Sequence, residues 1–461
     1  ERTMQKTNNN QSKKYEIDMI HGPLLGKILL FTLPLMVSSI LQLLFNAADI
    51  IVVGRYAGSD ALAAVGSTGA LINLLTNMFI GFSVGANVLV ARYYGAGKPD
   101  EVSETVHTSV MLSIIGGILL AAIGIIFASP LLELMGTPEN VLPLAALYVR
   151  IYFAGMPVTL LYNYGSAILR AIGDTKRPLY YLAVAGVLNI ILNLIFVIVF
   201  EMSVAGVALA TILSQTLSAI LVIRCLMHTE GGCHLDLHQL KIHSHKLWKI
   251  LQLGLPAGLQ GSIFSLSNVL IQSSVNSFGA IAMAGNSAAA NIEGFTYVAM
   301  NSFYQAAITF VSQNMGAMEF KRIRKIAWQC LACVTVTGAL LGNLSFFFGH
   351  QLLGIYSDEA EVIRYGIYRL EVIGTTYFLC GIMDVCVGCL RGIGYAFLPM
   401  VVSLLGACGF RILWIFTVFK GHHDLHTLYI SYPISWAITA SVHMICFLIL
   451  YRRMVKKSRT A

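Results

Sequence analysis

Long apolar stretches follow one another along the chain, and short polar segments separate them. About 20 apolar residues are enough to cross the hydrocarbon core of a bilayer as one α-helix. The pattern therefore predicts an all-α membrane protein with twelve transmembrane helices. The predicted spans are 28–52, 61–90, 104–128, 141–168, 178–199, 204–226, 248–275, 280–311, 327–349, 363–390, 397–419 and 428–451.

The second half of the chain repeats the first at a shift of about 221 positions. Matching pairs include Pro34 and Pro256, Asn46 and Asn268, Pro178 and Pro399, and Ser214 and Ser435. Such a repeat in an apolar chain is typical of transporters with two structural repeats around a midplane site. Each half holds an even number of spans, so we expect two six-helix repeats of the same orientation.

Composition agrees with a membrane protein. Hydrophobic residues make up 57% of the chain and charged residues 11%, with a mean hydropathy of +0.74, whereas a soluble domain has about 25% charged residues. Lys and Arg gather in every second loop. Loops on the cytoplasmic side of a membrane carry an excess of positive residues, so these loops are predicted to be cytoplasmic. The net charge of +8 is thus a topological bias rather than a nucleic-acid surface, and both termini are predicted to be cytoplasmic.

The same bias and the loop lengths predict the domain organisation. We expect a polar cytoplasmic tail (1–22), an N-lobe (23–226), a cytoplasmic linker (227–246), a C-lobe (247–453) and a basic tail (454–461). The first residues lack the apolar core and cleavage site of a signal peptide, so no removable leader is expected.

Metal, redox and nucleotide chemistry are not favoured by the motifs. The nine cysteines include CxxC pairs inside predicted spans, where packing is the favoured interpretation. The histidines and Cys233 of the linker have no recognised ligand spacing, which favours a solvated loop. Gly95 to Lys98 resembles part of a phosphate-binding loop, but Pro99 stands where Ser or Thr is needed. We expect no cofactor, no metal and an ion gradient as the energy source.

Ionisable residues inside spans carry the most information, because each costs about 2.5 to 3.5 kcal/mol on insertion scales. Asp49 lies on one side of its helix with Asn46 and Gln42. Span 178–199 adds Asn189 and Asn193, one turn apart. A polar stripe in a membrane helix must face protein or water, so these residues are predicted to line a cavity, where Gln42 is predicted to bind substrate.

The C-terminal half has comparable stripes. Span 280–311 carries Glu293, and the polar or aromatic residues on the same side or at its edge are Asn286, Tyr297, Asn301 and Tyr304. The preceding span contributes Asn268 and Gln272, and span 363–390 contributes Asp384. A carboxylate next to tyrosine rings suits a lipophilic cation, so these residues are predicted to bind substrate.

Three further residues are predicted to form structural ion pairs. Arg150 and Glu371 occupy equivalent places in the two repeats and are expected to pair with each other. Arg411 is then expected to pair with Asp384 or Glu293, because an unpaired Arg in a span is costly.

The chain resembles the multidrug and toxic compound extrusion (MATE) transporters, and within them the branch common in Gram-positive gut bacteria. The resemblance covers nearly all of residues 20–455. The motifs that carry it are the segments Phe45 to Gly66, Gly254 to Leu259, Val311 to Ala317 and Cys389 to Gly394. It implies two lobes arranged as a V, alternating access, and export of amphipathic, mainly cationic compounds in exchange for H⁺ or Na⁺.

The resemblance also implies roles for single residues. Asp49 matches an aspartate implicated in ion coupling, with Asn189 close to it. Asn193 stands where several relatives have a second aspartate, which favours H⁺ over Na⁺, and Asn46 belongs to the same coupling group. The expected partners are small organic cations and the lipid bilayer of a bacterial plasma membrane, with no nucleic acid, and the protein is expected to act as a monomer.

Two alternatives stay open. A flippase for lipid-linked precursors belongs to the same superfamily, but the cavity acids argue against its strongly cationic cavity. A membrane-embedded enzyme would need a histidine-rich or metal-binding cluster in the spans, which hold almost no histidine.

Overall fold

The computed structural model describes residues 15–460, with the side chains of 459 and 460 left out. Most of the predicted polar tail at 1–22 and the end of the predicted basic tail at 454–461 therefore lie outside the described residues. Every regular element within 15–460 is helical, as the apolar pattern predicts.

The helices of the first half are α2 (Leu24–Tyr56), α3 (Ser59–Gly95), α4 (Pro99–Leu134), α5 (Leu142–Ala154), α6 (Met156–Ala171), α7 (Lys176–Leu194), its π-helical continuation η1 (Ile195–Val199) and α8 (Ser203–Met227). Two 3₁₀ turns follow, η2 (Gly231–Cys233) and η3 (Leu237–Gln239). The helices of the second half are α9 (Ser244–Asn276), α10 (Ala280–Gly316), α11 (Phe320–Phe347), α12 (Gly349–Gly354), α13 (Ala360–Arg369), η4 (Leu370–Gly374), α14 (Phe378–Gly392), α15 (Phe397–Ser403), η5 (Leu404–Gly409), α16 (Phe410–Trp414), η6 (Ile415–Phe419) and α17 (Leu425–Thr460).

Taken singly or joined end to end, these helical segments match the twelve predicted spans. Eight are long and apolar enough to cross a membrane, and two bent pairs bring that number to ten. The helices α9 and α10 are just as long, with 33 and 37 residues. They are less apolar because they carry the polar positions of the predicted substrate site.

Two spans predicted as single helices are bent. The break between α5 and α6 turns the chain by 48°, and that between η4 and α14 by 44°. Pro157 lies directly after the first break, where a residue without an N–H can begin a new helix. At the second, the hydroxyl of Thr376 donates to the carbonyl of Val372 at 2.6 Å, and such bonds bend helices.

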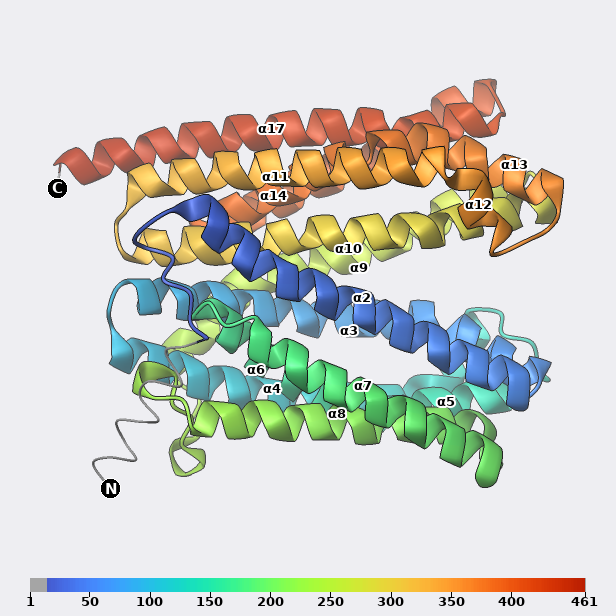
Figure 1. The fold of residues 1–461 in the computed structure, drawn as a ribbon, viewed down its shortest axis with the longest axis horizontal. Helices are drawn as coiled ribbons and strands as arrows, with labels where there is room; N and C mark the ends of the chain where they lie inside the picture. Colours follow the sequence, from blue (N-terminus) through green and yellow to red (C-terminus); the bar gives the residue numbers. More distant parts are fainter. Residues whose placement is uncertain (1–14, 461) are drawn as a thin grey trace. The chain divides into compact units, whose positions relative to one another are not determined.

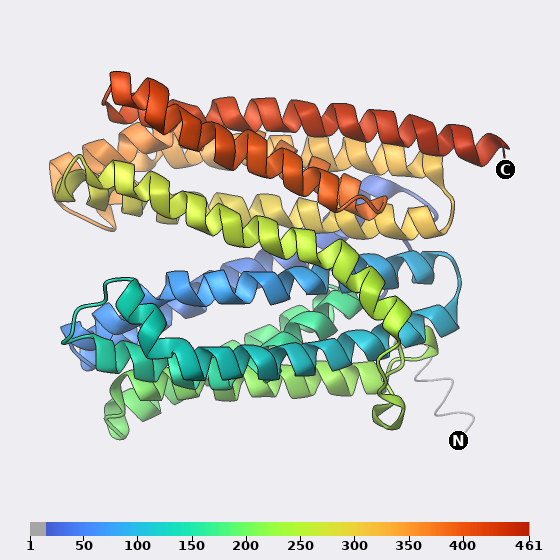
Figure 2. The same ribbon diagram turned by 180° about the vertical axis from the view of Figure 1, so that it is seen from behind.

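The chain forms two compact units. The first contains Leu33–Ser262 with the segment that ends at Asp18, and the second contains Met19–Thr32 with the chain from Ile263 onward. In the first unit, α4 packs against α3, α5 and α6, and α8 packs against α5, α6 and α7 (Figures 1 and 2). In the second unit, α10 packs against α11, α13 and α14, and α14 packs against α17.

Glycines allow a close helix crossing within the first unit. A Cβ atom at Gly81 of α3 would lie 2.2 Å from the backbone nitrogen of Gly258 in α9, and one at Gly85 would lie 2.3 Å from the carbonyl oxygen of Ile250. Small residues four apart let membrane helices approach backbone to backbone. This crossing therefore depends on glycine.

The segment between α8 and α9 packs on α4, and most histidines of the predicted linker are exposed. The Nδ1 atom of His107 lies 2.7 Å from the carbonyl oxygen of Ser103, so Nδ1 carries the proton. Its Nε2 then accepts a hydrogen bond of 3.1 Å from the backbone N–H of Asp236. Lys246 is 3% exposed and pairs with Glu101. These contacts hold the segment and the first turn of α9 to the start of α4.

Cys233 of the same segment is buried, and burial raises the pKa of its thiol to about 12. A thiol that keeps its proton is a poor metal ligand. Within residues 15–458, no group of three or more His, Cys, Asp or Glu side chains is arranged to hold a metal ion.

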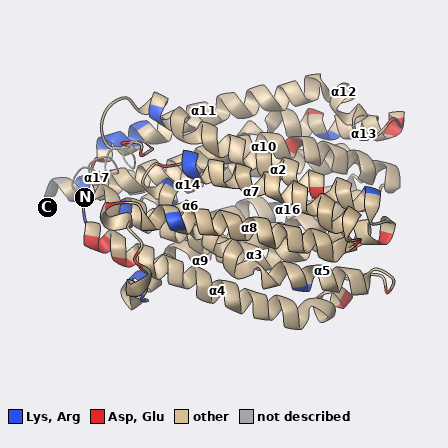
Figure 3. Ribbon diagram, turned by 60° about the horizontal axis from the view of Figure 1, so that its bottom comes forward, with Lys and Arg blue, Asp and Glu red and all other residues tan. Residues whose placement is uncertain are grey.

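Charges in the second unit separate toward opposite ends of its helices. Basic residues gather where α11 begins, and acidic residues lie around α12 and α13 (Figure 3). Between these ends the side chains are overwhelmingly uncharged, as the interior of a bilayer requires.

Candidate functional site

A cavity of about 310 Å³ lies inside the first unit, among α2, α3, α5, α6, α7 and α8. The predicted residues Gln42, Asn46, Asp49 and Asn189 all line it. Asp49 is half-buried, whereas Gln42 and Asn46 are exposed. The structure thus places the polar stripe of α2 on the wall of a cavity, where such a stripe can be solvated.

Asp49 accepts a hydrogen bond from one of two linked asparagines on α7. Asn193, which is fully buried, donates from Nδ2 to Oδ1 of Asp49 and to Oδ1 of Asn189 at 3.1 Å. The Nδ2 atom of Asn189 donates a hydrogen bond of 3.4 Å to the hydroxyl of Ser214 in α8. The carboxylate and both asparagines therefore form one connected polar group across three helices.

The other polar residues of the cavity wall are grouped along their helices. The lining includes Thr211, Ser214, Gln215 and Ser218 of α8, Thr159 and Asn163 of α6, and Asn73 and Thr76 of α3. Spacings of three or four positions place each set on one side of its helix. None of these residues was predicted from the sequence to belong to the site, although their periodicity is a signal that could find them.

The charge on this wall is one-sided. Among the residues that the structure describes, Asp49 is the only acidic one that lines the cavity, and no Lys, Arg or His lines it. Tyr152 and Phe45 add aromatic surface. A carboxylate with amides and rings around it suits a proton or an organic cation.

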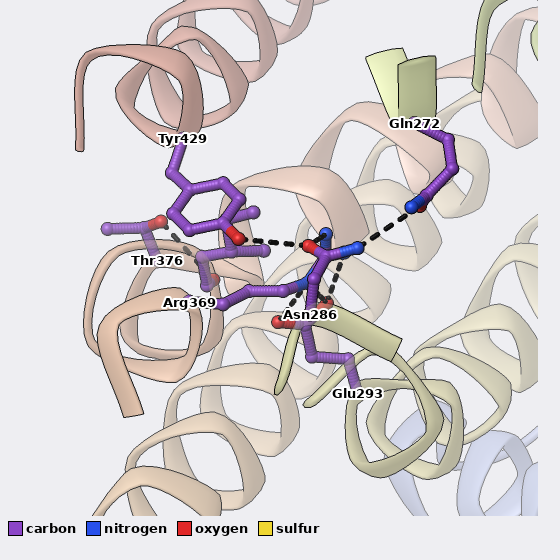
Figure 4. A network of polar contacts seen from close by, with 7 residues as sticks. Gln272, Asn286, Glu293, Arg369, Thr376 and Tyr429 are labelled. Atoms are coloured by element: carbon purple, nitrogen blue, oxygen red, sulfur yellow. Dashed lines mark hydrogen bonds and ion pairs between the residues drawn. The ribbon is translucent and has the colours of Figure 1, made fainter. Parts of the chain in front are cut away.

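A second polar cluster lies within the other unit, and its centre is an ion pair (Figure 4). Arg369 donates to Glu293 from Nε at 3.2 Å and from Nη2 at 2.9 Å. Its Nη1 donates to Oδ1 of Asn286 at 2.8 Å, and Tyr429 donates to the same oxygen at 3.0 Å. Asn286 in turn donates to Gln272 at 3.1 Å.

This cluster corrects the prediction that Glu293 binds the positive charge of a substrate. Glu293 is only 3% exposed, and the guanidinium of Arg369 occupies both of its oxygens. A carboxylate that already has a buried cation offers little to a second one. The residues are 76 positions apart, so the pairing depends on how α10 and α13 pack, which no local pattern reveals.

The other predicted substrate residues are scattered over the second unit. Gln272 belongs to the cluster around Arg369, while Asn268 is exposed. Tyr297 stacks on Tyr377 with 6.4 Å between ring centroids, and Asn301, one turn along α10 from Tyr297, is half-buried.

Tyr304 and Asp384 lie near a second arginine. The hydroxyl of Tyr304 accepts from Nη1 of Arg391 at 2.5 Å. Asp384 is half-buried on α14 and interacts electrostatically with the same Arg391. Tyr297, Asn301 and Asp384 stay candidates for substrate contact, whereas the buried Tyr304 is engaged by Arg391.

The ion pair predicted for Arg411 is not formed. Glu293 is taken by Arg369, and no Asp or Glu of residues 15–458 lies within 4.0 Å of the Arg411 guanidinium. Arg411 donates instead to the hydroxyl of Ser435 at 2.9 Å. Elimination among the acids of the sequence cannot find this contact, because it takes no account of Arg369, which occupies Glu293.

Arg150 makes its contacts within the first unit. Its guanidinium donates to the hydroxyl of Ser129 at 3.0 Å and to the carbonyl of Ile125 at 3.3 Å. Glu371 is exposed and belongs to the second unit. The pair predicted between Arg150 and Glu371 stays a prediction.

These features are typical of a polytopic α-helical transporter with two repeats. The MatE family model matches residues 34–195 and again residues 256–417, one match per repeat. The chain therefore belongs to the MatE family, the MATE transporters that its motifs resemble.

Relatives and solved structures agree. The chain is 30% identical over 420 residues to "Probable multidrug resistance protein YoeA" of Bacillus subtilis, covering 89% of this chain and 90% of that protein. It is 25% identical over 397 residues to "FAD transporter" of Shewanella oneidensis, covering 83% and 86%. The fold is similar to that in "Crystal structure of MATE in complex with MaL6", with a TM-score of 0.89, 21% identity, and coverage of 95% and 98%.

Proposed function

We propose that this protein is a secondary antiporter that exports amphipathic, mainly cationic compounds in exchange for H⁺. One observation carries the proposal: within the described part of the chain, the wall of the first unit's cavity has a single carboxylate, that of Asp49, and no basic residue. A proton and an organic cation can therefore compete for the same group. Binding of one would exclude the other, which is the minimum requirement of an antiporter.

The surroundings of Asp49 favour H⁺ over Na⁺. Sodium needs a cage of several oxygen ligands, whereas the nearest polar atom from α7 is the Nδ2 donor of Asn193. A single carboxylate can take up one proton without any rearrangement of ligands. Protonation would also change the hydrogen bond from Asn193, and so bias one packing of α2 and α7 over another.

Relatives support the cargo class, because the proteins most similar in sequence include several described as multidrug resistance or export proteins. The distribution of Lys and Arg supports insertion in a bacterial cytoplasmic membrane with both termini inside. We propose that the monomer is the transporting unit, since the cavity lies within one chain.

The test is export of a fluorescent organic cation from proteoliposomes under an imposed pH gradient or an imposed Na⁺ gradient. Asp49→Asn is expected to reduce pH-driven export to the rate without a gradient, while the purified variant still binds the dye. Asp60→Asn is the matched control, because Asp60 is an exposed carboxylate at the start of α3. Full pH-driven export by Asp49→Asn would refute the proposal.

A further inference from the structure

Arg411 is a buried arginine in an irregular span. It lies on α16, a stretch of five residues between the π-helical segments η5 and η6. Its exposed fraction is 4%. Wide π turns are rare and are found frequently at functional sites, so their presence on both sides of a buried charge points to a binding role.

The guanidinium of Arg411 is only partly satisfied. Nε donates to the hydroxyl of Ser435, which itself donates to the carbonyl of Tyr432 at 2.8 Å. The Nη2 nitrogen is buried and has no hydrogen-bond partner among the described residues. A buried donor without a partner loses its hydration and regains nothing.

Two aromatic rings stabilise the charge without neutralising it. The guanidinium carbon lies 4.1 Å from the ring centroid of Tyr432 and 5.4 Å from that of Trp436. Such contacts are weaker than an ion pair, and they leave the N–H groups at the edge of the guanidinium without acceptors. The rings therefore explain why the side chain is tolerated but not what Nη2 binds.

Arg369 shows what a satisfied arginine looks like in the same unit. It also contacts the ring of Tyr432, at 5.8 Å, yet it has a bidentate carboxylate partner and an amide oxygen besides. Arg411 lacks both kinds of partner. Arg411 therefore differs from Arg369 above all in having no negatively charged acceptor among the described residues.

We propose that Arg411 holds an anion inside the second unit. The anion is small and monovalent: chloride, or the carboxylate of a zwitterionic cargo. The planar guanidinium edge suits either, because it offers parallel N–H groups to an acceptor. This anion site, made of Arg411, Ser435, Tyr432 and Trp436, is separate from Asp49 and does not rest on the proposed coupling role.

The test measures thermal unfolding of the purified protein in detergent, at fixed pH, Na⁺ concentration and ionic strength. Chloride replaces the bulky anion methanesulfonate stepwise. The unfolding temperature of the parent is expected to rise and then saturate. Arg411→Met is expected to abolish the rise, and Arg411→Lys to weaken the apparent affinity about tenfold, the loss of roughly one charge-assisted hydrogen bond.

The control variant is Arg364→Gln, whose arginine is exposed and paired with Glu361 on the surface; it should keep the full chloride effect. Benzoate and benzamide distinguish the two sources of anion. Saturation by benzoate but not by benzamide assigns the site to a cargo carboxylate, and saturation by chloride alone assigns it to an inorganic anion. No saturable effect in the parent, or an unchanged effect in Arg411→Met, would overturn the proposal.

A second measurement does not depend on the Arg411 variants folding. Iodide quenches tryptophan on contact, and Trp436 is only 4% exposed. Iodide at the anion site is expected to quench a component of the fluorescence saturably, and Trp436→Phe should remove that component. Quenching that is purely linear in iodide, and equal in the parent and Trp436→Phe, would also overturn the proposal.

Discussion

Arg369 donates to both carboxylate oxygens of Glu293 inside the second unit. The pair ties α13 to α10 at a point where both side chains are largely removed from solvent, with exposures of 12% and 4%. Asn286 extends it to Tyr429 of α17. A charged cluster of this kind fixes the packing of three helices, so its first consequence concerns stability rather than transport.

Glu293→Gln is expected to destabilise the protein by about 3 to 5 kcal/mol, because it leaves the buried guanidinium of Arg369 without a countercharge. Thermal unfolding of the purified variant in detergent measures the effect. The control is Glu361→Gln, which breaks a surface pair with Arg364 whose two side chains are 52% exposed, and such pairs contribute about 0 to 1 kcal/mol. Combining Glu293→Gln with Arg369→Gln should recover part of the loss. Equal unfolding temperatures for both single variants would contradict this role.

Asn193→Asp is expected to confer Na⁺-driven export, because it adds a second carboxylate beside Asp49 and removes the amide donor. Two acids within reach of one cation form a better oxygen cage than an acid and an N–H. Export of a cationic dye under a Na⁺ gradient at constant pH measures the gain.

The control for this prediction is Asn163→Asp. Asn163 lines the same cavity, but its amide donates to the carbonyl of Thr159 at 2.9 Å. The Asn163→Asp substitution adds the same negative charge to the cavity as Asn193→Asp does, but at a different position. If both variants respond to Na⁺ alike, or neither does, the position next to Asp49 is not what selects the ion.

Gly258→Ala is expected to lower stability by about 1 to 3 kcal/mol, the usual cost of overpacking. Its new methyl group would lie 2.5 Å from the carbonyl oxygen of Met78, a backbone atom that cannot rotate away. Gly66→Ala is the matched control on α3, since a Cβ there meets nothing within 4 Å, and alanine favours a helix. Thermal unfolding should therefore separate the two variants, and a Gly258→Ala protein as stable as Gly66→Ala would show that α3 and α9 do not cross so closely.

The repeat and the order of the spans could be predicted because both are properties of the chain itself. Apolar length defines a span, and a shift of about 221 positions pairs the halves. The bends could not be predicted in the same way. The apolar pattern runs without interruption through Gly155 and Thr376, and the turn there depends on Pro157 and on hydroxyl groups that bond to the backbone.

The two polar clusters differ in how far they could be predicted. Asp49, Asn189 and Asn193 stand out because each is polar within an apolar helix and has a polar neighbour one turn away. The partner of Glu293 depends on which helices pack together. That partner, Arg369, lies near the edge of its predicted span. Local spacing finds residues on one helix but cannot choose among acids and bases on different helices.

His107→Ala is expected to release the segment between α8 and α9 from α4. The neutral imidazole accepts the backbone N–H of Asp236 through Nε2, and without it that donor loses its partner, at a cost of about 1 to 3 kcal/mol. The segment should then open more often, and trypsin should cleave faster after Lys241, whose side chain is already exposed. Limited proteolysis of the purified protein measures the rate of this cleavage, with the integrity of the helical units checked by thermal unfolding.

His238→Ala serves as the control, because His238 is an exposed histidine of the same segment. Faster cleavage in His107→Ala than in both His238→Ala and the parent is the expected result, while equal rates in all three would mean that the imidazole does not hold the segment.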